Sequence, residues 1–168
     1  MKRTTRRLLF ACCLLLCNLG VASAQSDAAL TREVNAFVDE WHDDAAHARL
    51  AYFDKIASDG IYIGTDKTEL WRRDEFRTWA RKQFERKSAW SFKATRRNVY
   101  FSPDKSVIWF DELLDTPNMG TCMASGVIRR TGSRFEIVHY QLSIAVPNEI
   151  ARKVTALIKE FEAQQVKK

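Results

Sequence analysis

The chain has 168 residues, of which 46% are hydrophobic and 29% are charged, and its 27 Lys and Arg residues exceed its 21 Asp and Glu residues. Four of the basic residues and none of the acidic ones lie in the first 24 residues, so the remaining 144 residues carry 23 basic against 21 acidic side chains. That near-neutral balance lacks the basic stripe of a nucleic-acid-binding domain, so no nucleic-acid partner is expected, and 144 residues suffice to bury the core of one domain.

The N-terminus has the layout of a secretory signal peptide. Basic residues between Lys2 and Arg7 precede an apolar run from Leu8 to Val21, and the small residues from Ala22 to Ala24 follow as a cleavage site. The apolar run is shorter than the ~20 residues that a membrane-spanning helix needs. We therefore predict a signal peptide over residues 1–24 and a single exported domain over residues 25–168, periplasmic or secreted and not inserted in a membrane. A retained N-terminal anchor is the alternative.

Cysteine usage limits how the mature domain is stabilised. Three of the four cysteines, Cys12, Cys13 and Cys17, lie within the predicted signal peptide, and only Cys122 remains. A single cysteine cannot form an intrachain disulfide, so a packed core must stabilise the domain. We interpret Cys122 as a small buried apolar side chain, since a nucleophilic role would need a base beside it.

Helical spacing of apolar residues dominates the first half of the mature chain. Residues 25–50 repeat apolar side chains every three or four positions, which predicts a long helix. Residues 48–60 predict a second, short helix that ends at Gly60, and residues 61–66 predict a short strand. Helical spacing returns over residues 72–87.

From residue 90 onward the apolar spacing changes to a period of two. Four segments are predicted as strands joined by short turns: residues 90–104, 106–116, 120–132 and 134–146. The tail begins at Pro147 and again repeats apolar residues at helical spacing, which predicts an amphipathic C-terminal helix.

This order of elements predicts an α+β fold, with N-terminal helices packed on a curved antiparallel sheet and a further helix at the C-terminus. In the second long strand Trp109 and Leu113 point to one side, whereas Phe110 and Leu114 point to the other. A sheet that is apolar on both faces needs cover on both faces. Helices cover one face, so we predict that a second copy of the chain covers the other face in a homodimer.

A resemblance to a known family rests on three stretches: YIGTDKTELWRRDEFRTWA, VIWFDELLDT after an SPD turn, and FEIVHYQLSIAVPN. In their order and spacing they make the chain, from Thr31 to Asn148, resemble the SnoaL-like group of the nuclear transport factor 2-like (NTF2-like) superfamily. The resemblance implies a cone-shaped domain, usually a homodimer, whose curved sheet and helices enclose a pocket. The superfamily includes cyclases, isomerases, dehydratases and non-enzymatic binding domains, so the fold by itself does not assign a function.

Two adjacent acids, Asp111 and Glu112, are the first candidates for a catalytic site. Neighbouring strand residues point to opposite faces, so only one of the two faces the pocket, and the sequence does not say which. A carboxyl group in an apolar pocket has a raised pKa and serves as a general acid or base. The alternative is that the inward acid binds a buried Tyr, Trp or Arg side chain and orders the core.

His139 is the third catalytic candidate, because a histidine beside a pocket carboxylate transfers protons at neutral pH. Cross-strand polar partners or a dimer interface are its alternative roles. Candidate ligand contacts are aromatic or amide side chains in and beside the predicted strands: Tyr62, Trp71, Trp109, Tyr140 and Gln141. The resemblance implies that Tyr62 and Trp71 lie at the mouth of the cone, and a place in the core is their alternative.

No metal or cofactor is expected. His42 and His47 are five residues apart, which separates them around a helix, and the sequence has no Gly-rich phosphate loop. Two functions remain open. The first is an exported pocket protein that binds a small apolar or aromatic molecule, or serves as a dimeric accessory domain. The second is a cofactor-independent acid–base enzyme (isomerase, cyclase, dehydratase or hydrolase) that uses a pocket carboxylate. Export favours the first, because polyketide cyclisation happens beside an intracellular synthase.

Overall fold

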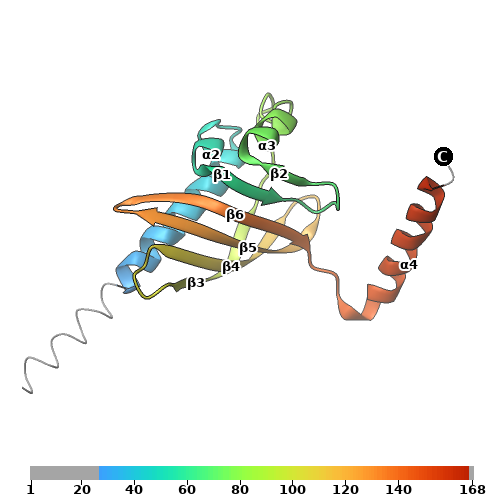
Figure 1. Cartoon of the computed structure of the whole chain (residues 1–168). Coiled ribbons are helices and arrows are strands. Elements are labelled where there is room, and N and C mark those ends of the chain that lie inside the picture. The colour runs from blue at the N-terminus through green and yellow to red at the C-terminus, as the bar shows by residue number, and fades with distance from the viewer. Residues whose placement is uncertain (1–26, 167–168) are drawn as a thin grey trace, which may run out of the picture. The chain divides into compact units, whose positions relative to one another are not determined.

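A computed structural model describes residues 27–166 of the chain (Figure 1). The signal peptide predicted over residues 1–24 lies outside the described residues. The chain divides into two compact units between Trp41 and His42. The first unit is helical throughout its described residues, 27–41, and the apolar repeat predicted from its spacing supplies its buried residues: Leu30, Val34, Val38 and Trp41.

The second unit begins with the end of this helix, at residues 42–46. Its further elements follow in the order α2 (Ala51–Asp54), β1 (Ile56–Ile63), β2 (Leu70–Arg72), α3 (Arg73–Ala80), β3 (Lys93–Phe101), β4 (Val107–Thr116), β5 (Gly120–Thr131), β6 (Arg134–Ile144) and α4 (Asn148–Gln165). The predicted α+β class and the run of four long strands are confirmed.

All six strands form one curved sheet in the order β2-β1-β6-β5-β4-β3 (Figure 1). The four long strands are antiparallel neighbours, because short turns connect each to the next. In contrast, β1 pairs with β6 in parallel, with Tyr62 opposite Tyr140. No hairpin joins these two strands, so their relative direction is set by the long return of the chain.

The second predicted helix is shorter than expected. It ends at Asp54, and Ile56 already begins β1. Gly60 therefore lies inside a strand, where the pairing with β6 shifts register between Ile56 and Ile61. A Cβ atom at Gly60 would lie 2.9 Å from a carbonyl oxygen of the same strand and 2.9 Å from the Ile137 carbonyl oxygen. Gly60 thus permits close backbone approach at a bulge and does not stop a helix.

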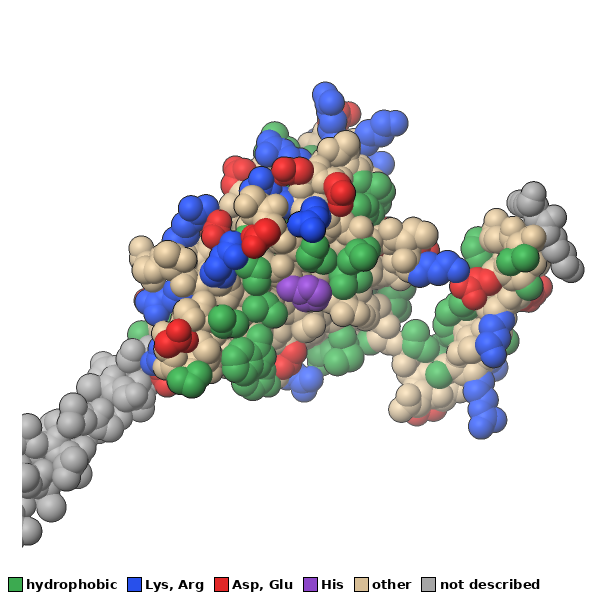
Figure 2. Space-filling model, in the orientation of Figure 1, with side chains coloured by type: hydrophobic (Ala, Val, Ile, Leu, Met, Phe, Trp, Pro, Cys, Tyr) green, Lys and Arg blue, Asp and Glu red, His purple; other side chains and the backbone are tan. Residues whose placement is uncertain are grey.

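Alternation along β4 gives the sheet two distinct faces. We call the face with Phe110, Glu112 and Leu114 the inner face, because these side chains are buried. The opposite, outer face keeps several large apolar side chains 42–51% exposed: Tyr100, Val107, Trp109 and Met123. Figure 2 shows hydrophobic side chains gathered over the strands. The prediction of a sheet that is apolar on both sides is therefore confirmed.

Aromatic side chains fill the space between the inner face and the two short helices. Phe53 of α2 and Phe76 of α3 are both buried, with ring centroids 5.6 Å apart. Phe76 also stacks on Tyr62 of β1, at a centroid distance of 4.0 Å. Packing of this kind buries large apolar area and fixes α3 against β1.

The C-terminal helix α4 is confirmed, but none of its 18 residues is buried. Its apolar side chains at helical spacing stay exposed, among them Ile150, Leu157, Ile158 and Phe161. Among the helices that the structure describes, none combines the length and apolar character needed to cross a lipid bilayer.

Candidate ligand pocket

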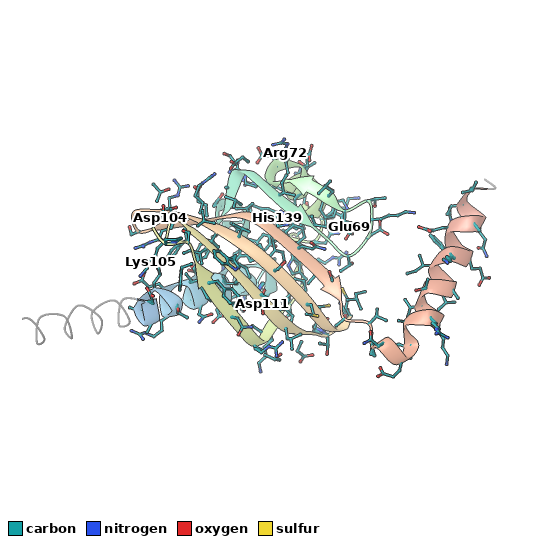
Figure 3. The ribbon with its side chains drawn as sticks, turned by 60° about the horizontal axis from the view of Figure 1, so that its bottom comes forward. Glu69, Arg72, Asp104, Lys105, Asp111 and His139 are labelled. Carbon is teal, nitrogen blue, oxygen red and sulfur yellow. The ribbon has the colours of Figure 1, made fainter. Side chains whose placement is uncertain are left out.

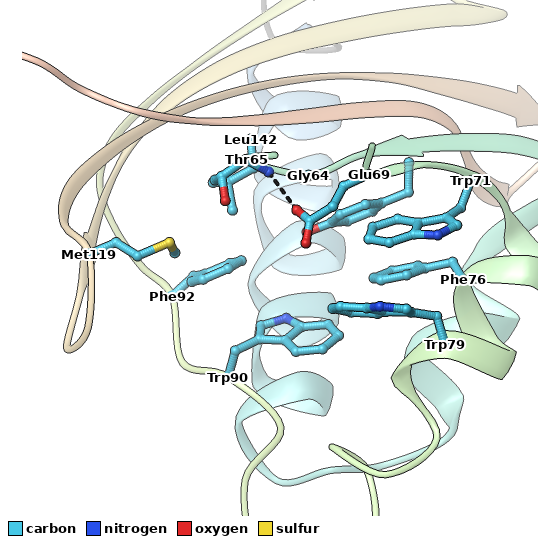
Figure 4. Close-up of a pocket in the computed structure, with 11 residues that line it drawn as sticks. Gly64, Thr65, Glu69, Trp71, Phe76, Trp79, Trp90, Phe92, Met119 and Leu142 are labelled. Carbon is cyan, nitrogen blue, oxygen red and sulfur yellow. Dashed lines mark hydrogen bonds between the residues drawn. The ribbon is translucent and has the colours of Figure 1, made fainter. Parts of the chain in front are cut away.

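A pocket of about 170 Å³ lies beside the aromatic side chains of β1, β2 and α3 (Figure 4). Its walls come from distant parts of the second unit: Tyr62, Gly64, Thr65, Glu69, Trp71, Phe76, Trp79, Trp90, Phe92, Met119 and Leu142. Six of these side chains are aromatic, and Glu69 is the one carboxylate among them. The pocket is thus a small, mainly aromatic space with a single acidic group.

Phe76 is the centre of the aromatic wall. The rings of Trp71, Trp79 and Trp90 lie at 5.3, 6.0 and 5.7 Å from its ring, all within 25° of parallel. Trp79 remains 46% exposed, so this part of the wall reaches the surface. The helical turn between Phe76 and Trp79 places both rings on the same side of α3, because residues three apart share a helix face.

Glu69 is positioned by its own loop, between β1 and β2. Its Oε2 atom accepts hydrogen bonds from the backbone N–H groups of Thr65, at 2.9 Å, and Asp66, at 3.2 Å. Gly64 leaves the room for this arrangement, since a Cβ atom there would lie 2.9 Å from the Glu69 Cβ and closer still to its carboxylate. Figure 4 shows the Glu69 carboxylate directed into the space between the rings.

A second feature of the inner face is the buried carboxylate of Glu112. Its Oε1 is 2.8 Å from Nε2 of His42 and accepts a hydrogen bond from the Tyr140 hydroxyl at 3.1 Å. Its Oε2 accepts from Nε of Arg97 at 2.9 Å and lies 2.8 Å from a terminal nitrogen of the same guanidinium. The four side chains form a polar cluster within the core.

The environment of Glu112 keeps its carboxylate charged. Burial favours the neutral acid and raises the pKa, but the hydrogen bond and charge of His42 and those of Arg97 together outweigh burial. The pKa of Glu112 therefore lies below its ordinary value. A carboxylate held in this way is a weak proton acceptor, so its main effect is to orient His42, Arg97 and Tyr140.

Tyrosine hydroxyls next to these acids stay protonated. Burial raises the pKa of Tyr140 well above its ordinary value, and the negative charge of Glu112 adds to that rise. Burial also raises the pKa of Tyr62; the Tyr52 hydroxyl opposes this, while the charges of Glu69 and Glu112 reinforce it. Both hydroxyls are therefore neutral hydrogen-bond donors at any physiological pH.

The polar cluster and the pocket are adjacent but separated by aromatic rings. Phe92 lines the pocket and its ring lies 5.8 Å from that of His42. Tyr62 also lines the pocket, and its ring lies 5.4 Å from that of Tyr140. Neither His42 nor Glu112 is among the pocket-lining residues. One layer of side chains thus stands between the buried acid and the pocket.

Comparison with models of protein families identifies the family of the chain. A family model of the SnoaL-like domain matches residues 34–147, a span that includes the pocket and the polar cluster. The chain belongs to the SnoaL-like family. This confirms the resemblance drawn from the three sequence stretches. Among curated proteins, none matches the chain.

Solved structures share the fold of this SnoaL-like domain. An NTF2-like protein of unknown function from Pseudomonas putida KT2440 is similar, with a TM-score of 0.60, 13% identity, and 73% of this chain and 91% of that one covered. A protein from Parabacteroides distasonis ATCC 8503, provisionally named a ketosteroid isomerase, has a TM-score of 0.55 and 16% identity, covering 68% and 86%. The association domain of C. elegans CaMKII has a TM-score of 0.56 and 13% identity, covering 70% and 98%. At these identities the likeness shows the shared fold.

The SnoaL-like domain places the predicted site residues on both faces of the sheet. Glu112 and Tyr140 face inward and meet in the polar cluster, while Tyr62 and Trp71 line the pocket. The other four lie on the outer face: Trp109, Asp111, His139 and Gln141. Figure 3 shows Asp111 and His139 on the same side of the sheet. There Asp111 accepts hydrogen bonds from Asn98, at 2.7 Å, and from the Tyr100 hydroxyl, at 3.0 Å.

Sequence reasoning missed two members of the polar cluster. His42 was considered only as a metal ligand, although it follows Val38 by four residues and therefore extends the apolar stripe of its helix. Arg97 is one of two adjacent basic residues, a pattern that does not by itself indicate a buried partner. Its pairing with Glu112 depends on the register of β3 against β4, which no local pattern determines.

Four pocket aromatics were also not proposed as ligand contacts: Phe76, Trp79, Trp90 and Phe92. Phe76 and Trp79 carry the helical spacing of a core-facing helix, and that spacing does not distinguish a filled core from a pocket wall. Trp90 and Phe92 precede β3 and alternate as strand residues do. Their convergence on one space is visible only in the folded domain.

No metal site appears among residues 27–166, where no group of three or more His, Cys, Asp or Glu side chains is arranged to hold an ion. Cys122 is buried, and burial raises the pKa of its thiol. A thiol in that state is a weak nucleophile, which supports its interpretation as a core residue.

Proposed function

We propose that the mature SnoaL-like domain is an exported pocket protein that binds a small apolar or aromatic molecule. The observation that carries this proposal is the pocket itself, in which six aromatic side chains surround a space of about 170 Å³. Mainly aromatic walls with few polar groups are typical of small-molecule sites, because they desolvate an apolar ligand without leaving polar groups unpaired.

The volume limits the ligand to a small one. A cavity of ~150 Å³ is known to accommodate a benzene molecule, and the pocket has about 170 Å³. Drug-sized ligands need ~300 Å³ or more. We therefore expect a single-ring compound, or a compact branched group of similar size, or one such group of a longer molecule whose remainder extends past the exposed edge of Trp79.

Ligand-observed NMR with a panel of single-ring compounds tests the proposal. We expect saturable binding to the wild-type protein and no binding to a Met119→Trp variant, in which the larger side chain fills the pocket from the turn between β4 and β5. Met123→Trp is the matched control, because Met123 lies on the outer face and the same substitution there leaves the pocket open. Binding that survives Met119→Trp, or no binding by any compound, would contradict the proposal.

Acid–base catalysis is the second candidate function. The hydrogen bond between Glu112 and His42 favours it, because a carboxylate that orients a histidine makes that histidine an effective general base. We place binding first because the pair does not line the pocket and Glu112 is also held by Arg97. Turnover of any bound compound that is lost in His42→Asn, with binding retained, would establish the catalytic function instead.

We also propose that the domain forms a homodimer. Its support is the outer face, where Tyr100, Val107, Trp109 and Met123 form an exposed apolar surface. A second copy presenting the same face would bury both surfaces at once, as two-fold interfaces do. The similar fold from C. elegans is itself named an association domain.

Export rests on the N-terminal sequence pattern alone. We propose cleavage after Ala24 and release into the periplasm or the medium. Intact-mass measurement of protein recovered from a periplasmic fraction tests this: the expected chain begins at Gln25. A chain that keeps residues 1–24 and fractionates with membranes would indicate a retained anchor.

A further inference from the structure

The one acid in the pocket, Glu69, bears on which class of ligand fits. We infer that the pocket recognises a small organic cation, such as a trimethylammonium or benzylammonium group, held between the Glu69 carboxylate and the aromatic rings. This inference rests on the proposed function, since it requires that the pocket bind a ligand, and it adds the charge of that ligand.

Glu69 is held with its charge directed inward. Two backbone N–H groups of its loop donate hydrogen bonds to Oε2, which fixes the carboxylate, and Figure 4 shows the carboxylate directed into the space bordered by Phe92, Trp90 and Phe76. The basic side chain of the same loop, Lys67, pairs with Glu162 at 2.5 Å and does not line the pocket. The negative charge of Glu69 is therefore not neutralised by Lys67.

The rings add a second attraction for a cation. The face of an aromatic ring carries partial negative charge, so Trp, Tyr and Phe faces attract ammonium groups, with Trp the strongest. Three tryptophans line this pocket, Trp71, Trp79 and Trp90, together with Phe76. An anion would be repelled by both Glu69 and the ring faces, and a neutral ring would displace water from the Glu69 carboxylate without offering it a compensating positive charge.

Gly64 supports the same arrangement from the backbone. A Cβ atom there would overlap the Glu69 carboxylate. The absence of a side chain at this position thus lets Glu69 fold back over its loop and point into the pocket. Gly64 is a positioning residue, and its replacement would move the charge without removing any ring.

Two pairs of ligands, each a cation and a neutral compound of similar shape, distinguish the effect of ligand charge on binding from the effect of ligand shape. Choline and 3,3-dimethylbutan-1-ol differ by replacement of the quaternary nitrogen with carbon, and benzylammonium and benzyl alcohol present the same ring with and without a cation. We expect wild-type protein to bind the cation of at least one pair about tenfold or more tightly than its neutral partner by isothermal titration calorimetry. That preference should weaken as salt is added, because it is electrostatic.

The Glu69→Gln variant tests whether the charge of Glu69 causes the preference for the cation. Its amide oxygen still accepts the two loop N–H bonds, so the loop should keep its shape while the charge is lost. We expect the preference for the cation to fall to about twofold or less, with binding of the neutral partner unchanged. Gly64→Ala should reduce the preference as well. Glu85→Gln is the matched control, because Glu85 is exposed after α3 and outside the pocket.

Different results would contradict the inferred preference for a cation and the proposed binding of a ligand in the pocket. Equal binding of cation and neutral partner in both pairs, or a cation preference that Glu69→Gln leaves intact, would overturn the inference while the pocket remains a ligand site. Absence of binding by all four compounds would overturn it too. Only if the single-ring panel also gives no binding would the proposed function fail with it.

Discussion

Glu112 keeps its charge inside the core because three side chains surround it with hydrogen bonds. It is only 2% exposed, and its Arg97 partner has a side chain that is 5% exposed. Removing one member of a buried ion pair leaves the other charge without compensation, which costs more than the pair itself contributes. Asp111, the next residue along β4, has neutral partners on the outer face. The two neighbouring acids therefore make a matched comparison.

The first prediction concerns stability. Glu112→Gln should lower the free energy of unfolding by about 3 kcal/mol, because the Arg97 guanidinium stays buried opposite a neutral amide. Asp111→Asn should change it by less than about 1 kcal/mol. Urea denaturation of the two variants and the wild type measures both values. Equal losses of unfolding free energy in the two variants would show that the charge of Glu112 stabilises the domain no more than the charge of Asp111 does.

The second prediction concerns pH. The pKa of Glu112 is lowered in the folded domain, so its contribution to stability is complete above its unfolded-state pKa, ~4.3. That contribution is lost as the pH falls through the lower, folded-state pKa. Below pH ~5 the wild type should therefore lose stability more steeply than Glu112→Gln.

Other acids do not obscure this difference in slope. Asp104, whose pKa the hydroxyls of Ser102 and Ser106 lower to about 2, titrates equally in both proteins. The measurement is the free energy of unfolding at pH 6, 4.5 and 3 for each protein. Parallel pH profiles would mean that Glu112 has an ordinary pKa in the folded domain.

At the scale of elements, β1 shows how a local pattern is overridden by pairing. Residues 48–60 have the apolar spacing of a helix, yet Ile56 to Ile63 form a strand beside β6. Pairing satisfies the backbone groups of β1 and places Tyr62 on the inner face beside Tyr140. The same element positions the Gly64 and Glu69 loop at its end. The pocket therefore depends on this strand.

Gly60 provides the third prediction. Gly60→Ala should destabilise the domain by about 1–3 kcal/mol, because its Cβ would press on carbonyl oxygens of β1 and β6 that cannot move independently. Ser58→Ala, at an exposed position of the same strand, should cost under about 0.5 kcal/mol. Thermal unfolding of both variants measures the difference. If Gly60 served only to end a helix, Gly60→Ala would be mild and the contrast would vanish.

At the scale of the whole molecule, the outer face of the sheet carries several large apolar side chains that are exposed. Trp109 stacks on Tyr100 at 5.9 Å and remains 43% exposed. Rings of this size are enriched at the centres of protein interfaces, where they contribute much of the binding energy. A homodimer through this face also leaves the pocket, which opens among α3 and β2, free for ligand.

The fourth prediction follows for the assembly. Trp109→Lys should convert the proposed dimer into a monomer, because it places a charge at the centre of the apolar face. Trp79→Lys is the control: it should leave the dimer intact and weaken ligand binding, since Trp79 lines the pocket. Sedimentation velocity over a hundredfold range of concentration measures the assembly. A wild-type protein that is monomeric at all these concentrations would contradict the dimer.

The sequence by itself determined the elements whose periodicity is local. The four long strands, the C-terminal helix and the α+β class follow from alternation and helical spacing, and the resemblance of three short stretches indicated the SnoaL-like family. It also determined that Asp111 and Glu112 point apart, because successive strand residues do so in any register.

Only the tertiary structure decided which acid faces inward and what surrounds it. That choice depends on the side of the sheet against which the helices pack, and the partners of Glu112 come from residues 15 to 70 positions away in the chain. The pocket has the same origin: Tyr62, Glu69, Trp79 and Trp90 meet because β1 pairs with β6 and α3 packs on β1. Long-range contacts of this kind produce no periodic pattern in the sequence. Which residues meet depends on how the strands pair and on how the chain folds back, and not on the spacing of residues along the chain.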